Sequence, residues 1–317
     1  MEFFIFIISI YCTYFTTLKL LPFFRKNFGQ IPNERSSHNK LTPSGGGLIF
    51  VVISILISLF NNYYRLLIYL PLALIGIFDD KYDLKPIYRY GAQFLTVLFI
   101  VFISLSKGFL ISISNNISDP SIFGLIFISI IFGTALINFI NFMDGIDGLI
   151  GGTTFIFLIT ASFINNNLLA LAGCLLGFLI LNWSPAKIFM GDVGSTFLGS
   201  VIVGEIFINK SFNESFGLLL IISPVLLDAF LCVLRRFFAK QNIFKPHKLH
   251  LYQRLCSNGW SHAKVTSIYI LSSILISLAY IIVNLETAFV SLIVISLIGL
   301  LLDWKCALPF KKAIRLP

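Results

Sequence analysis

Long apolar stretches alternate with short polar connections along most of this chain. A helix that crosses a bilayer needs about 20 predominantly apolar residues, because each residue advances the helix by only about 1.5 Å. The alternation therefore predicts about eleven membrane-spanning helices. They run over residues 3–21, 46–60, 65–78, 90–106, 121–138, 148–163, 168–183, 193–209, 216–234, 265–283 and 287–302.

The composition supports a membrane protein. Of the 317 residues, 57% are hydrophobic and 12% are charged, whereas about 25% of the residues of a soluble domain are charged. We expect a single all-α, polytopic membrane domain over residues 1–317, with no soluble domain attached. The 5 cysteines show no CxxC spacing, so the sequence indicates neither a disulfide framework nor a zinc site.

Lysine and arginine are distributed unevenly between alternate connections. With this set of spans, all 23 of these residues except Arg65, Lys107 and Lys210 lie on the side of the first connection and the C-terminal tail. Basic residues concentrate on the cytoplasmic side of membrane proteins, so we expect the N-terminus outside and the C-terminus inside. The net charge of +9 is then mainly a topology signal that also suits anionic lipid headgroups. No nucleic-acid-binding surface is expected.

The first apolar stretch is not expected to be a cleavable signal peptide. Its basic residues, Lys19, Arg25 and Lys26, follow the apolar run instead of preceding it. A signal peptide has the opposite order. The stretch is therefore predicted to remain in the protein as its first membrane span.

Acidic, amide, glycine and histidine residues gather in connections that this topology places on the cytoplasmic face. These connections carry DDKYD (Asp79 to Asp83), NFMDGIDGL (Asn141 to Leu149), MGDVGS (Met190 to Ser195) and HKLHLYQRL (His247 to Leu255). Such residues at one end of a helical bundle are typical of an enzyme site. An earlier turn, RSSHNKLTPSGGGL (Arg35 to Leu48), has three glycines in a row. They serve either as a plain turn or as a point of close backbone approach.

Asp79 and Asp80 end the third apolar stretch, and Asp83, Lys85 and Arg89 follow them. One interpretation is a solvated loop in which acids pair with bases. The other is a carboxylate pair that handles a metal or a proton beside cations that hold phosphate. These residues alone do not decide between the two.

Asn138, Asn141, Asp144 and Asp147 recur at intervals of three, with no lysine or arginine among them. Residues three apart share a face of a helix, so we expect these four side chains to line one face. Capping of helix ends explains one or two of them. The full set favours a site that takes its positive charge from a ligand or a metal.

Asp192 lies between Gly191 and Gly194, just before an apolar stretch. It is either the N-cap of the next helix or a residue that a phosphate or metal approaches, for which the glycines leave room. A basic group follows in the last polar connection: His247, Lys248, His250 and Arg254. It is either a solvated loop or, facing the acidic residues, a clamp for an anion.

In series, DDKYDLKP, NFMDGIDGL and MGDVGS resemble the polyprenyl-phosphate N-acetylhexosamine-1-phosphate transferases, and the resemblance runs from about Arg35 to Leu255. The HKLHLYQRL loop and the RSSH…GGG entry look most like the branch that initiates O-antigen synthesis. The peptidoglycan branch typically has a denser run of histidines. Ser44 stands where many relatives have arginine before the glycines, which leaves the sugar open.

The resemblance implies transfer of N-acetylhexosamine-1-phosphate from a UDP-sugar to undecaprenyl phosphate in the bacterial inner membrane, with release of UMP. It implies Mg²⁺ or Mn²⁺ as cofactor, with Asn141 and Asp192 as ligands. The residues given catalytic roles are Asp79, Asp80, Asp144 and Asp147. The residues given substrate-binding roles are Asn138, Arg89, His247, Lys248, His250 and Arg254. The downstream polymer and homodimer formation stay open.

Three alternatives compete with this prediction. A phospho-MurNAc-pentapeptide transferase of peptidoglycan synthesis would use the same chemistry. A secondary transporter would keep its polar sites near the bilayer midplane, often within inverted repeats, whereas the acids here lie at span ends. A CDP-alcohol phosphotransferase would continue its acidic motif with Ala-Arg, whereas Asp147 is followed by Gly148, Leu149 and Ile150.

Overall fold

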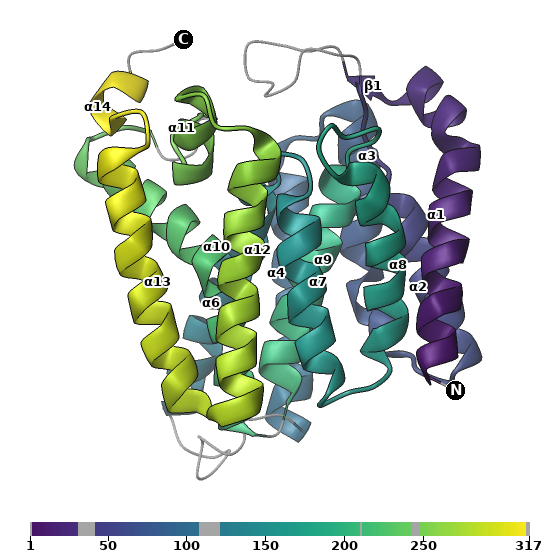
Figure 1. Ribbon diagram of the computed structural model, residues 1–317. Coiled ribbons are helices and arrows are strands. Elements are labelled where there is room, and N and C mark those ends of the chain that lie inside the picture. Colours follow the sequence, from purple (N-terminus) through teal and green to yellow (C-terminus); the bar gives the residue numbers. More distant parts are fainter. Residues whose placement is uncertain (1, 31–41, 108–120, 210, 243–246, 315–317) are drawn as a thin grey trace.

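The computed structural model describes residues 2–30, 42–107, 121–209, 211–242 and 247–314. In these ranges the chain forms a bundle of long helices (Figure 1) and one antiparallel pair of two-residue strands, β1 (Gly29–Gln30) and β2 (Thr42–Pro43). The helices are α1 (Glu2–Asn27), α2 (Gly47–Phe60), the 3₁₀ helix η1 (Arg65–Tyr69), α3 (Leu70–Tyr82), α4 (Pro86–Lys107), α6 (Ser121–Met143), α7 (Leu149–Ser162), α8 (Leu168–Asn182), α9 (Gly191–Ile208), α10 (Phe212–Phe238), α11 (Leu251–Ser257), α12 (His262–Leu278), the π-helix η2 (Ala279–Val283), α13 (Leu285–Lys305) and α14 (Phe310–Ala313). Residues 35–41 of the glycine-rich entry turn and Lys210 lie outside the described ranges.

The predicted all-α membrane fold is confirmed, and every predicted apolar stretch coincides with a helix. In the described part of the chain, 7 helices are long and apolar enough to cross a bilayer, and α2, α7 and α8 are shorter apolar helices. Many large apolar side chains of α1, α4, α6 and α13 point outward, as expected where the surroundings are lipid. The chain is therefore a multi-pass membrane protein.

Helix α9 lies at the centre of the bundle. In its apolar stretch 89% of the residues are buried, against 6% in α13. Glycines let its neighbours approach closely: a Cβ on Gly47 of α2 would lie 2.4 Å from Cα of Gly194, and one on Gly76 of α3 would lie 2.5 Å from Cα of Val193. The glycines beside Asp192 and in the entry turn therefore serve helix packing, which fixes α2 and α3 against the start of α9.

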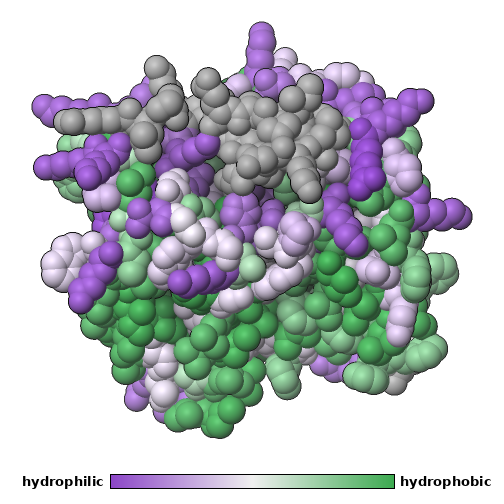
Figure 2. All heavy atoms as spheres, turned by 45° about the horizontal axis from the view of Figure 1, so that its top comes forward, coloured by the Kyte–Doolittle hydropathy of each residue, from purple (hydrophilic) through white to green (hydrophobic). Residues whose placement is uncertain are grey.

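The two termini lie at opposite ends of the bundle (Figure 1). At the N-terminal end, Arg65 forms an ion pair with buried Glu205 at 3.2 Å, and Nδ2 of Asn166 donates to the Glu2 carboxylate at 2.9 Å. Figure 2 shows hydrophilic side chains gathered at the other end, above a hydrophobic band. This arrangement separates a polar end, near the C-terminus, from the part of the bundle that contacts lipid.

Candidate active site

Asp80, at the end of α3, reaches across to the first turn of α9. Its carboxylate accepts from the backbone N–H groups of Asp192 at 2.9 Å and of Val193 at 3.3 Å. These N–H groups have no partner within the helix, so an acid from another element satisfies them and complements the positive helix end. A Cβ on Gly191 would lie 2.3 Å from the Asp80 carboxylate, which explains the glycine. Asp80 therefore positions the turn that carries Asp192.

Arg89, in the first turns of α4, links two of the predicted acids. Its guanidinium donates to Asp79 at 2.7 Å and to Asp192 at 3.1 Å. The other oxygen of Asp79 accepts from the backbone N–H of Leu84 at 2.8 Å. Arg89 thus neutralises a carboxylate pair drawn from two helices, where the sequence predicted a contact with substrate phosphate.

Helix α6 brings two amides to the same place. Asn138 exchanges hydrogen bonds with the Gln93 amide, and Asn141 accepts from the Ser195 hydroxyl at 2.5 Å. A cavity of about 40 Å³ is lined by polar residues from three helices, Arg89, Asn138, Asn141 and Asp192, and by apolar residues that include Leu72, Ile75 and Phe142. A space of this size suits a water molecule or an ion. The two predicted metal ligands therefore face one small cavity, and a nucleotide-sugar must lie beyond it.

The prediction that Asn138, Asn141, Asp144 and Asp147 share one helix face is wrong. Helix α6 ends at Met143, so Asp144 and Asp147 lie in the turn before α7. Gly148, with φ of +73°, supports this turn, because left-handed backbone angles favour glycine. The period of three therefore holds for the two amides only.

Asp147 turns away from the amides. It accepts from the backbone N–H of Ala186 at 3.3 Å and forms an ion pair with His262 at 3.3 Å. Burial would raise the pKa of Asp147, but the hydrogen bond and charge of His262 outweigh burial and hold that pKa below its usual range. This environment favours a supporting role for Asp147 over the predicted catalytic one.

Asp144 has a different environment. Burial, with added repulsion from Asp80 and Asp147, raises the pKa of Asp144 to about 7. A carboxyl group in this state gains from a nearby cation, since opposite charge favours the ionised form. Of the two acids in this turn, Asp144 therefore keeps the stronger case for contact with a metal or substrate.

A second buried acid, Asp228 on α10, holds the histidine loop. Its carboxylate accepts from the backbone N–H groups of Leu251 at 2.7 Å and Tyr252 at 3.2 Å, and from the Tyr269 hydroxyl at 2.7 Å. The Tyr252 hydroxyl in turn donates to the carbonyl of Phe142 at 3.2 Å. The start of α11 is thereby fixed beside the end of α6, which places His250 at the polar end of the bundle.

The two histidines of this loop are not cationic at neutral pH. Burial, followed by the charge effects of His250 and Arg236, lowers the pKa of His247 to about 3. Burial and Arg236 lower the pKa of His250 to about 4. As part of an anion clamp these side chains would act as neutral hydrogen-bonding groups, and positive charge must come from other residues.

The guanidinium of Arg254 is already hydrogen-bonded within the protein. Arg254 is 2% exposed, and its guanidinium donates to the carbonyls of Leu249 and Leu308 and to the carboxylate of Asp303. It therefore ties α11 to the C-terminal segment. Lys85 lies exposed between α3 and α4, and Lys248 lies between the two histidines. Lys85, which is exposed, is better placed than Arg254 to meet an anion at this end of the bundle.

The sequence did not predict a role in the site for three further residues, Gln93, Ser195 and His262. Each touches a predicted site residue: Gln93 bonds Asn138, Ser195 bonds Asn141 and His262 pairs with Asp147. The spacing of Gln93 four residues after Arg89 on one helix was a usable signal. The other two contacts join distant segments and leave no local pattern.

Comparison with known proteins identifies a family and several relatives. Residues 62–209 match the family model for glycosyl transferase family 4. The chain is 31% identical to a probable undecaprenyl-phosphate N-acetylglucosaminyl 1-phosphate transferase of Bacillus subtilis (strain 168), covering 83% of this chain and 79% of that protein. It is 33% identical to a phospho-N-acetylmuramoyl-pentapeptide-transferase of Thermoanaerobacter sp. (strain X514), covering 77% and 86%.

A third relative extends the range of polyprenyl carriers. A decaprenyl-phosphate N-acetylglucosaminephosphotransferase of Mycobacterium leprae (strain TN) is 27% identical, with 74% of this chain and 71% of that protein covered. Residues 62–209 contain Asp79, Asp80, Asn141 and Asp192. Both the match and the helical architecture lead to one conclusion: the chain belongs to glycosyl transferase family 4, among the polyprenyl-phosphate hexosamine-1-phosphate transferases.

Proposed function

We propose that the protein transfers N-acetylhexosamine-1-phosphate from a UDP-sugar to undecaprenyl phosphate at the cytoplasmic face of a bacterial inner membrane. The product would be undecaprenyl-pyrophosphate-sugar, the starting point for O-antigen or a related envelope polysaccharide. The observation that carries this proposal is the meeting of Arg89, Asn141 and Asp192, from three helices, around one cavity at the polar end. Asp79 is joined to this group through its ion pair with Arg89. The relatives named above supply the substrate classes.

In this reaction an oxygen of the lipid phosphate attacks the sugar-linked phosphorus of the UDP-sugar. The bond from that phosphorus to the bridging oxygen breaks, and UMP leaves with the bridging oxygen. A phosphate monoester has a second pKa of about 6, so the lipid phosphate that acts as nucleophile is already largely ionised at neutral pH. Alignment and charge compensation therefore matter more than a strong base, which suits a site where Asp79 is already paired with Arg89.

The oxygen atoms at the cavity fit magnesium. Mg²⁺ prefers oxygen ligands, and is usually held by one or two protein groups together with substrate phosphates. Asn141 and Asp192 would hold it, since their oxygen atoms line one cavity of ion size. When bound, the metal would offset the negative charge of the two phosphates. Asp80 would keep Asp192 in place through the first turn of α9.

A panel of donors tests the proposed function. Purified protein with undecaprenyl phosphate and Mg²⁺ should release UMP from a UDP-N-acetylhexosamine, because the site and the family both fit this chemistry. The match to a pentapeptide-transferase makes UDP-MurNAc-pentapeptide the second candidate donor. If UMP is released from UDP-MurNAc-pentapeptide alone, the protein would be assigned to the peptidoglycan branch. No UMP from any UDP-sugar would overturn the proposal.

We also propose that the polar end faces the cytoplasm, as the distribution of basic residues indicates. The turn at residues 165–167 lies at the N-terminal end, through the Asn166 contact with Glu2, and Lys311 lies on α14 at the opposite end. An engineered cysteine at Asn166 in intact cells should react with a membrane-impermeant maleimide, whereas one at Lys311 should react only after lysis. Labelling of Lys311 in intact cells would contradict the orientation. Cys12, also exposed, is replaced by serine in both variants.

A further inference from the structure

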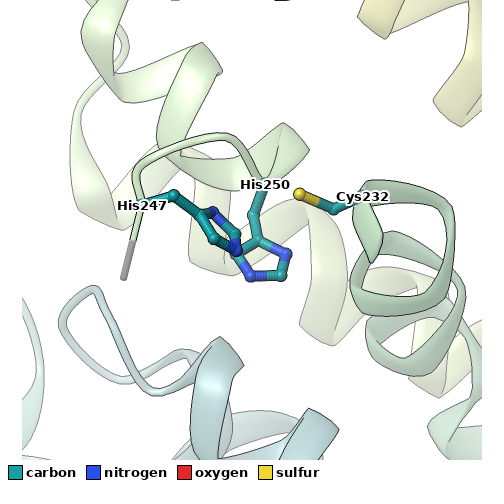
Figure 3. A group of neighbouring side chains, drawn as sticks. All are labelled: Cys232, His247 and His250. Atoms are coloured by element: carbon teal, nitrogen blue, oxygen red, sulfur yellow. The ribbon is translucent and has the colours of Figure 1, made fainter. Parts of the chain in front are cut away.

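A sulfur and two imidazoles converge outside the cavity lined by Asn141 and Asp192. Cys232 comes from α10, and His247 and His250 come from the loop before α11 (Figure 3). One ligand atom from each residue lies within 4.8 Å of the others. Cys232 is 3% exposed and His250 is 2% exposed, whereas His247 is half-buried, so water reaches the group from the side of His247.

The histidines in this group are available to a metal. A ligating imidazole must be neutral, and the surroundings of both histidines, one buried and one half-buried, favour the neutral form. Nδ1 of His250 is buried and has no hydrogen-bond partner among the described residues. Since buried polar atoms are nearly always bonded, this atom points to a partner that the protein alone does not supply.

A buried carboxylate lies close to this unpartnered nitrogen. Oδ1 of Asp228 lies 4.0 Å from Nδ1 of His250, too far for a hydrogen bond. Asp228 is itself fixed by Leu251, Tyr252 and Tyr269, so it is a fixed acidic group beside a cation bound at Nδ1.

We propose that Cys232, His247 and His250 bind one Zn²⁺ ion, with a fourth coordination position open to water or an anion. Thiolate and imidazole suit zinc, whereas magnesium takes oxygen ligands. Zn–S and Zn–N bonds of about 2.3 Å and 2.0 Å require ligand atoms somewhat closer than 4.8 Å. A contraction of about 1 Å, by side-chain rotation and a small loop shift, therefore completes the site.

Three costs oppose binding: nearby positive charge, loss of the thiol proton and loss of one hydrogen bond. Arg236 and Arg254 add positive charge near the histidines, which the Cys232 thiolate and Asp228 offset. Binding releases the thiol proton to solvent. Nδ1 of His247 accepts from the backbone N–H of Leu249 at 3.2 Å, and coordination through either ring nitrogen sacrifices this long hydrogen bond. The gain of three metal bonds exceeds the loss of one such contact.

No pattern in the sequence indicates this site, because the end of α10 and a loop separate Cys232 from the histidines. The zinc would fasten His247 and His250 to α10. Zinc content is measured without the transfer reaction, so the proposal is tested separately from the donor assay described above.

Metal analysis of the purified full-length protein tests the proposal. After dialysis against metal-free buffer, one equivalent of Zn²⁺ is added, and the wild type should retain about one zinc per chain. Cys232→Ser and His250→Ala should weaken zinc affinity about tenfold or more, since even outer residues of metal sites have effects of about 10–100-fold. Cys256→Ser, a matched change at a half-buried cysteine outside the group, should retain zinc.

Cobalt gives a second readout that does not depend on variant stability. Co²⁺ added to the wild type should produce an intense thiolate-to-metal absorption band, present in Cys256→Ser and absent from Cys232→Ser. Failure of the wild type to bind zinc, or equal binding and an unchanged cobalt band in Cys232→Ser, would overturn the proposal. In the second case the ion would be adventitious or bound by the acidic residues.

Discussion

Replacing Asp192 with alanine should lower turnover by about a hundredfold or more, while the protein stays folded in detergent. Loss of an outer residue around a metal site already costs about 10–100-fold, and Asp192 is a proposed ligand. The Asp192 side chain is 28% exposed and forms an ion pair with Arg89. Because it is not packed in the core of the bundle, its removal should leave the protein folded. Asn141→Ala should act in the same direction, because its amide oxygen lines the same cavity.

The measurement is initial-rate UMP release at saturating donor, with thermal unfolding in detergent as the folding check. EDTA should abolish wild-type activity, and Mg²⁺ alone should restore it, which separates this requirement from zinc bound elsewhere. Asp83→Asn is the control, since Asp83 is an exposed acid at the same end and asparagine tolerates its left-handed φ of 49°. Near-normal turnover of Asp192→Ala, or activity unaffected by EDTA, would exclude the proposed metal site.

The helices were largely predictable because the bilayer imposes a strong pattern. Backbone groups in lipid must bond within their own segment, so apolar stretches of sufficient length become helices, as α4, α6 and α10 show. The end of α6 was not predictable from periodicity. Helix α6 stops at Met143, where the glycines of the following turn favour a break, and this moved Asp144 and Asp147 off the face shared by the two amides.

The polar runs of the sequence located the site but not its internal contacts. Three predicted residues, Asp79, Asp192 and Arg89, form one ion-paired group. The bonds of Asp80 to the backbone of α9 could not be foreseen, because they depend on how closely α3 packs against that helix. Burial, which a sequence does not report directly, is also what makes His247 and His250 neutral.

Arg89 supplies the positive charge between Asp79 and Asp192. A divalent cation held by Asp192, as proposed above, would compete with this guanidinium for the same carboxylate. Arg89 would then be free to turn toward the phosphates of the substrates. The predicted phosphate contact of Arg89 would in this way be compatible with its observed ion pairs.

Replacing Arg89 with alanine should therefore have two opposite effects. Turnover should fall, because a cation for the phosphates is lost, but half-maximal activity should need less Mg²⁺, because a competing charge is removed. If that competition is worth about 1.4 kcal/mol, the Mg²⁺ requirement falls about tenfold. Titration of activity with Mg²⁺ measures both effects, and Arg89→Lys, which keeps the charge, should leave the requirement near the wild-type value. A higher Mg²⁺ requirement in Arg89→Ala would show that Arg89 helps to build the metal site instead of competing for it.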